Sequence, residues 1–74
     1  NMKIENLDEV LRLTKEFRQQ QELNQRLHEG GTITVHVNGF DIEISNDLRK
    51  RVRNALIEEV KAKRDEIRKQ LETL

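Results

Sequence analysis

Residues 30–45 read GGTITVHVNGFDIEIS, and this stretch decides the fold of the chain. Asn38-Gly39 separates two alternating apolar runs, and both residues tolerate the positive φ angles of a type I′ turn. A two-residue turn there fixes the pairing outward as Val37 with Phe40, His36 with Asp41, Val35 with Ile42, Thr34 with Glu43 and Ile33 with Ile44. We therefore predict an antiparallel β-hairpin over about 32–44, with one apolar and one polar face.

An isolated two-stranded hairpin is only marginally stable in water, so we expect its apolar face to rest on helices. Leu23 and Leu27 lie on a helical face that could receive it. The open edges of the hairpin also invite pairing with another chain.

The composition points to self-association. The chain has 74 residues, no cysteine and no proline, with 34% hydrophobic and 38% charged residues. A chain this short often needs disulfides, a metal or oligomerisation to become stable. Because cysteine is absent, disulfides and cysteine-based zinc or redox motifs are excluded. We therefore expect one domain, residues 1–74, that assembles with copies of itself.

The first helix is predicted over about 6–28, with Asn6 or Asp8 as its cap and Gly30-Gly31 ending it. Steps of three and four residues trace an apolar seam that turns polar towards the helix end. In order, this predicted seam contains Leu7, Val10, Thr14, Phe17, Gln21, Asn24 and His28. Its polar half is either a solvated helix end or the lining of a cavity between subunits.

The second helix is predicted over about 46–73, with Ser45 or Asn46 as its cap. Its predicted seam contains Leu48, Val52, Leu56, Val60, Ile67, Leu71 and Leu74. Helices of similar length joined by a compact hairpin can fold back antiparallel. The predicted class is thus mostly helical α+β, with a long helix, a hairpin and a long helix assembling into a homo-oligomer. We expect the apolar seam residues Leu7, Val10, Phe17, Val60, Ile67 and Leu71 to form the oligomer interface.

Basic residues gather where the second helix begins. The net charge of the chain is zero, yet residues 46–64 hold seven basic and three acidic side chains. This basic cluster contains Arg49, Lys50, Arg51 and Arg53. Basic residues here oppose the positive end of the helix dipole, and a local rule broken without visible compensation suggests a functional role. Arginines at a helix N-terminus would favour a phosphate. The alternative is a solvated charged face whose basic residues pair with neighbouring acidic residues of the same chain or of another subunit.

Neither histidine sits in a metal or catalytic motif. His36 lies opposite Asp41 in the predicted register, so a cross-strand pair explains it, although it could also reach a ligand at the second helix. His28 suits the negative end of the first helix dipole. With no HExxH motif, activated nucleophile or glycine-rich phosphate loop, we expect no catalysis, no metal and no cofactor.

A helix, the hairpin VNGFDIEIS and a long charged helix ending EEVKAKRDEIRKQLETL together resemble small uncharacterised proteins of tailed phages and prophages. Some phage proteins of similar size are oligomeric sponges that bind nucleotide signals of bacterial immunity. This resemblance implies a cytoplasmic location in a bacterial host cell and ligand contacts from Arg49, Arg53, Lys50 and His36. His28 and Asn24 on the polar half of the first seam would complete the pocket. We take Met2 as the natural start, and we find no signal peptide and no apolar run long enough to cross a membrane.

Three hypotheses follow. The first is a homo-oligomer that sequesters an anionic ligand, above all a cyclic or linear nucleotide. The second is a structural or protein-interaction module that docks on a host or phage protein. The third is a weak nucleic-acid binder that uses the basic turn, although zero net charge argues against it.

Overall fold

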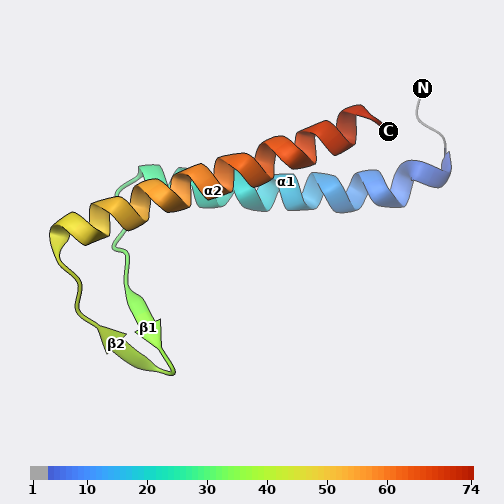
Figure 1. Ribbon diagram of the computed structural model, residues 1–74. Helices are drawn as coiled ribbons and strands as arrows, with labels where there is room; N and C mark the ends of the chain where they lie inside the picture. The colour runs from blue at the N-terminus through green and yellow to red at the C-terminus, as the bar shows by residue number, and fades with distance from the viewer. Residues whose placement is uncertain (1–3) are drawn as a thin grey trace.

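The computed structural model describes residues 4–74, so the start expected at Met2 lies outside the described residues. In chain order the elements are a short 3-10 turn, a helix, two strands and a second helix. They span η1 Ile4–Asn6, α1 Leu7–His28, β1 Val35–Val37, β2 Phe40–Ile42 and α2 Asn46–Glu72. The predicted arrangement of two long helices around an antiparallel hairpin is confirmed. The helices run antiparallel, with the hairpin at one end of the pair (Figure 1).

The hairpin has the predicted turn and register. Asn38 has a φ of 50° and Gly39 a φ of 82°, as a type I′ turn requires. Val37 pairs with Phe40, His36 with Asp41 and Val35 with Ile42. The strands themselves are only three residues long, so the predicted pairs of Thr34 with Glu43 and Ile33 with Ile44 lie outside the observed ladder. The flanking residues of the range 32–44 connect the hairpin to the helices.

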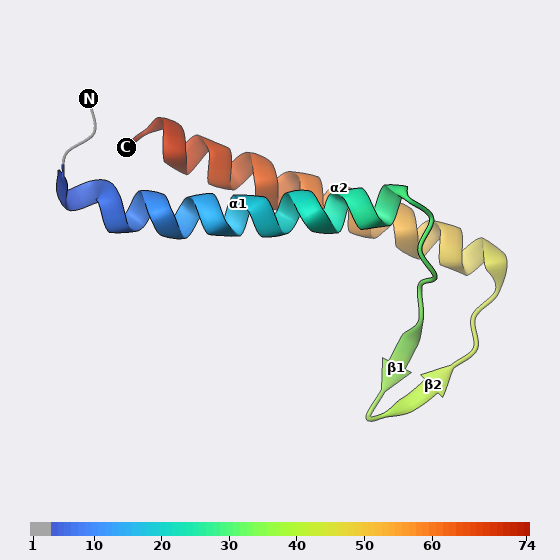
Figure 2. The ribbon, with the colours of Figure 1, turned by 180° about the vertical axis from the view of Figure 1, so that it is seen from behind.

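The expectation that the hairpin rests on the helices of its own chain is wrong. The hairpin projects from the end of the helix pair in both views (Figures 1 and 2). Val37 is 52%, Phe40 76% and Ile42 45% exposed, and Leu23 is also uncovered. The connections on either side of the strands carry the hairpin away from the helices, so the apolar side chains at its tip are left uncovered by residues 4–74.

The end of α1 and the beginning of α2 agree with the prediction, whereas Asn6 stands at the start of α1 without a side-chain capping hydrogen bond. The C-cap residue of α1 is Glu29, whose N–H donates to the Gln25 carbonyl at 3.0 Å, and Gly30 follows with a φ of 79°. Ser45 caps α2, because its Oγ accepts a 3.1 Å hydrogen bond from the N–H of Leu48. At about 1.5 Å per residue, the two helices are roughly 33 and 40 Å long.

The row of shielded residues on α1 differs from the predicted seam at every second position. Val10, Phe17 and Asn24 are partly shielded as expected, but Thr14, Gln21 and His28 are exposed. In each case the residue one position earlier is shielded instead, namely Leu13, Gln20 and Leu27. The shielded row therefore contains Val10, Leu13, Phe17, Gln20, Asn24 and Leu27. Steps of three and four taken in either order keep a row on one helix face, so the spacing alone does not choose between them.

The seam of α2 differs in a similar way. Ile57 is partly shielded while Leu56 is 40% exposed, and Arg64 occupies the seam position between Val60 and Ile67. Leu13, Val60 and Ile67 are the buried apolar residues of the described chain, and of these only Leu13 is fully buried. The helix pair therefore has a thin core, in keeping with two elements packed along a single line.

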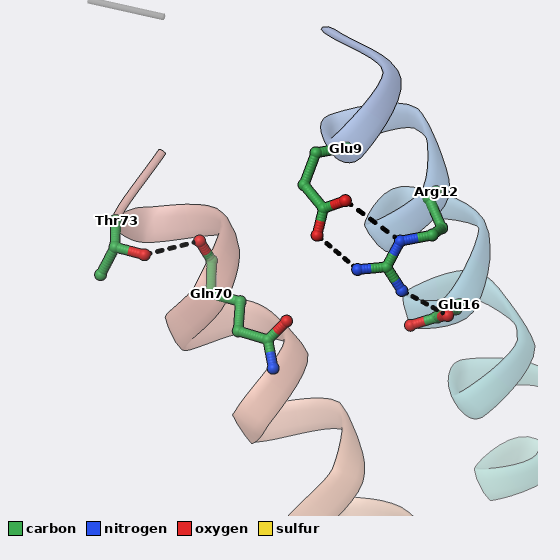
Figure 3. A network of polar contacts seen from close by, with 5 residues as sticks. All are labelled: Glu9, Arg12, Glu16, Gln70 and Thr73. Atoms are coloured by element: carbon green, nitrogen blue, oxygen red, sulfur yellow. Dashed lines mark hydrogen bonds and ion pairs between the residues drawn. The ribbon is translucent and has the colours of Figure 1, made fainter. Parts of the chain in front are cut away.

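Figure 3 shows a charged network on the surface of α1 near its beginning. Arg12 donates from Nε and Nη2 to the carboxylate of Glu9, and from Nη1 to Glu16 at 2.9 Å. The hydrogen bond and the charge of Arg12 hold the pKa of Glu9 below its usual value. Such pairs along one helix face support the helix locally without burying surface.

Candidate functional site

The end of α1 and the beginning of α2 meet at Arg53. Its Nη1 donates to the Leu27 carbonyl at 2.8 Å, and its Nη2 donates to the Gly31 carbonyl at 2.5 Å. The last carbonyls of a helix have no partner within the helix, and a cation there also suits the helix dipole. Arg53 thus caps α1 from α2, which gives a structural reason for one basic residue at this place.

Two further arginines of the basic cluster also have partners in the chain. Arg49 donates from Nε to the Ile33 carbonyl at 3.4 Å and from Nη1 to Asn46 Oδ1 at 2.8 Å. Arg51 donates to Asp47 Oδ2 at 3.2 Å across one helical turn. Arg49 and Arg53 therefore tether the loop that leads into the hairpin, and a role of the cluster in binding phosphate or nucleic acid stays a prediction.

The remaining predicted ligand residues lie apart from one another. His36 Nδ1 lies 2.5 Å from Asp41 Oδ1, and its Nε2 lies 3.0 Å from Thr34 Oγ1, so the expected cross-strand pair is confirmed. Lys50 and His28 are exposed, whereas Asn24 is half-buried between the helices. The structure does not bring these side chains together in one hollow.

A hollow of about 500 Å³ lies beside the end of α1. It is lined by Leu23, Arg26, Leu27, Glu29, Gly30, Gly31, Thr32, Ile33 and Arg53. Of the predicted ligand residues, only Arg53 lines it. Sequence reasoning missed Arg26, although an antiparallel helix pair places the last turn of α1, which contains Arg26, next to the basic turn of α2.

A polar layer interrupts the seam between the helices. Arg64 Nη1 donates to Gln21 Oε1 at 3.0 Å. Arg64 Nε and Asn24 Oδ1 are buried, and neither has a hydrogen-bond partner within the described chain. Arg64 was not among the predicted site residues, but the gap of seven residues between Val60 and Ile67 marks its seam position.

The predicted interface residues serve, in the first place, the pairing of the two helices within one chain. Val60 and Ile67 are buried in the helix pair, and Val10, Phe17 and Leu71 are partly shielded. Leu7 is more than half exposed. Their participation in contacts between copies stays a prediction.

A large apolar surface is left open instead. The apolar residues of the hairpin become more exposed towards its tip, from Ile33 and Val35, which are partly shielded, to Val37 and Phe40. A second hollow, of about 290 Å³, lies between the helices and is lined by Gln20, Leu23, Leu27, Leu56, Glu59, Val60 and Lys63. Leu23 and Leu27 line both hollows, so the apolar surface continues from the helices to the base of the hairpin.

Residues 4–74 contain neither a candidate metal centre nor a membrane-spanning helix. Within residues 4–74, no group of three or more His, Asp or Glu side chains is placed to hold a metal ion. Neither helix in this part of the chain is long and apolar enough to cross a membrane.

Comparison of the chain with protein-family models, with curated proteins and with solved structures found no match.

Proposed function

We propose that this protein is a homo-oligomeric interaction module, which assembles with copies of itself and presents the assembly to a partner protein. The observation that carries this proposal is the open apolar surface. The buried apolar residues of the described chain are Leu13, Val60 and Ile67, while the apolar face at the hairpin tip is exposed.

The area supports association of this kind. The chain exposes 6201 Å² of surface, although a compact monomer of 8.8 kDa is expected to expose roughly 4,800 Å². The excess of about 1,400 Å² is larger than the roughly 800 Å² that each partner buries in a standard protein interface. The elongated dimensions of 50 × 23 × 16 Å account for this excess.

The charge of the chain allows copies to approach. Fourteen basic and fourteen acidic residues give a net charge of zero. No net repulsion therefore opposes self-association, which highly charged chains avoid.

Native mass spectrometry and sedimentation with interference optics test this proposal. Interference detection is needed because the chain has no tryptophan or tyrosine to absorb at 280 nm. We expect an oligomer at micromolar concentration. A species of 8.8 kDa that persists up to the highest concentration would contradict the proposal.

Leu56→Glu tests whether the open helical surface contributes. Leu56 is exposed within one chain, so its replacement should leave the helical circular dichroism signal intact while reducing the oligomer mass. Ala62→Glu is the matched control, because it adds the same charge to an exposed position of α2 outside the lining of the 290 Å³ hollow.

A second candidate function is sequestration of an anionic ligand, and the hollow beside Arg26 and Arg53 favours it. Its volume of about 500 Å³ lies within the range of small-molecule sites. Calorimetric titration with a cyclic dinucleotide tests this candidate. Arg26→Glu should abolish the binding heat, and Arg18→Glu, elsewhere on α1, should leave it unchanged. Absence of binding heat in the unaltered protein would remove this candidate.

A further inference from the structure

The hairpin and the open side of the helix pair present two apolar surfaces that lie apart within one chain. The tip of the hairpin points away from the helices in both views (Figures 1 and 2). Phe40 at this tip is 76% exposed, and Leu23 on α1 is 47% exposed. Both surfaces are apolar and exposed to solvent, so each could pack against the other.

The hollow between the helices is suited to an aromatic side chain. Leu23, Leu27, Leu56 and Val60 form its apolar lining, and its volume is about 290 Å³. An apolar protein cavity of about 150 Å³ is large enough to bind benzene, so a phenyl ring fits within this volume. Gln20, Glu59 and Lys63 supply a polar rim, as is usual around the apolar centre of a protein interface.

We propose that two copies of this chain exchange hairpins, so that Phe40 of each copy enters the Leu23–Leu56 hollow of the other. This inference rests on the proposed self-association and specifies its geometry. The two contacts are related by a two-fold axis, because the same pair of surfaces meets twice. Such an interface closes on itself and leaves neither apolar surface open.

The occupant of the hollow is a second copy because the same chain carries both complementary surfaces. The apolar surface runs from the hollow through Leu27 to Ile33, where it continues on to the hairpin. Two such angled surfaces can interlock, with the hairpin of one copy lying along the helices of the other. The zero net charge leaves this approach unopposed.

Cysteine crosslinking tests the proposed contact, and the absence of native cysteine means that only introduced thiols react. One preparation carries Phe40→Cys, and a second preparation, with a different affinity tag, carries Leu56→Cys. The two are mixed and treated with a short bismaleimide. We expect a crosslinked species that contains both tags. Leu11→Cys replaces Leu56→Cys in the control, because Leu11 is an exposed leucine outside the hollow.

The outcomes separate this inference from the proposed function. An oligomer in which Phe40→Cys crosslinks no better to Leu56→Cys than to Leu11→Cys would overturn hairpin exchange and leave self-association standing. A monomer would overturn both. Efficient crosslinking within one chain of a dilute Phe40→Cys/Leu56→Cys double variant would show that the hairpin folds back on its own helices, which also overturns exchange.

The affinity of the unlabelled protein gives a second measurement. Phe40→Ser should weaken dimerisation by about a hundredfold, because two rings leave a symmetric interface and each contributes roughly tenfold. Leu11→Ser should change the dissociation constant by less than about threefold, as expected for a leucine outside the interface. Equal effects of the two substitutions would contradict a specific role for Phe40.

Discussion

Arg53 Nη1 donates a 2.8 Å hydrogen bond to the carbonyl oxygen of Leu27, and this contact joins the beginning of α2 to the last turn of α1. The same guanidinium also reaches Gly31 in the connection that follows α1. A basic residue near the positive end of its own helix thus serves the negative end of the neighbouring helix. The antiparallel fold removes the apparent conflict with the helix dipole.

Arg53→Ala should lower the free energy of unfolding by about 1.5–3 kcal/mol, the usual contribution of a hydrogen bond from a charged donor. Arg53→Lys should lose less, because lysine keeps the charge but lacks the planar fork that reaches two carbonyls. Urea unfolding at fixed protein concentration, followed by circular dichroism at 222 nm, measures both.

Arg51→Ala is the control for this prediction. Arg51 and Asp47 form an exposed pair within one helix, and such pairs contribute about 0.5 kcal/mol or less. If Arg53→Ala were no more destabilising than Arg51→Ala, the cap would have no role in stability.

Gly30→Ala should destabilise the fold by roughly 1–2 kcal/mol, because alanine is strained in the left-handed region that Gly30 occupies. An added Cβ at Gly30 meets no atom within 4 Å, so the whole effect is conformational. Gly31→Ala is a close control, since its Cβ would lie at an ordinary 3.7 Å from the Arg26 carbonyl and its φ is not positive. Thermal unfolding of both variants measures the difference, and equal midpoints would contradict the prediction.

The hairpin register could be predicted because turn chemistry and alternation agree. Asn38-Gly39 fixes the turn, and one apolar face then follows without ambiguity. The helical seams were harder, because Leu13 and Thr14, like Leu56 and Ile57, are neighbours about 100° apart that border the same seam on opposite sides. Packing against the opposite helix makes that choice, and a single sequence does not contain it.

The candidate site was only partly predictable for a different reason. The basic cluster around Arg49 and Arg53 was visible, but its partners are backbone carbonyls of distant residues, which have no sequence signature. The position of the hairpin was also not predictable. Alternation shows that the apolar face needs a cover, but it does not show whether that cover belongs to the same chain.

Asn24→Leu should raise the free energy of unfolding by about 1–2 kcal/mol, because Asn24 Oδ1 is buried without a hydrogen-bond partner and leucine would extend the apolar seam. Asn54→Leu is the control at an exposed position of α2, and a change within about 0.5 kcal/mol is expected there. Urea unfolding measures both variants. A loss of stability in Asn24→Leu would mean that the Asn24 amide is satisfied in solution, for example by water.

The pKa of Glu9 should rise towards 4.5 in Arg12→Gln, because the variant loses the hydrogen bond and the positive charge that lower it. Carbon-13 NMR titration of the Glu9 carboxyl group measures this pKa, with Arg18→Gln as a control on the same helix. A carboxyl group whose pKa is lowered by folding stabilises the fold above its unfolded pKa, and this stabilisation is lost as the pH falls through the folded value. The stability difference between the unaltered protein and Arg12→Gln should therefore be larger at pH 7 than at pH 2. A Glu9 pKa that is the same in both proteins would show that the network drawn in Figure 3 does not persist in solution.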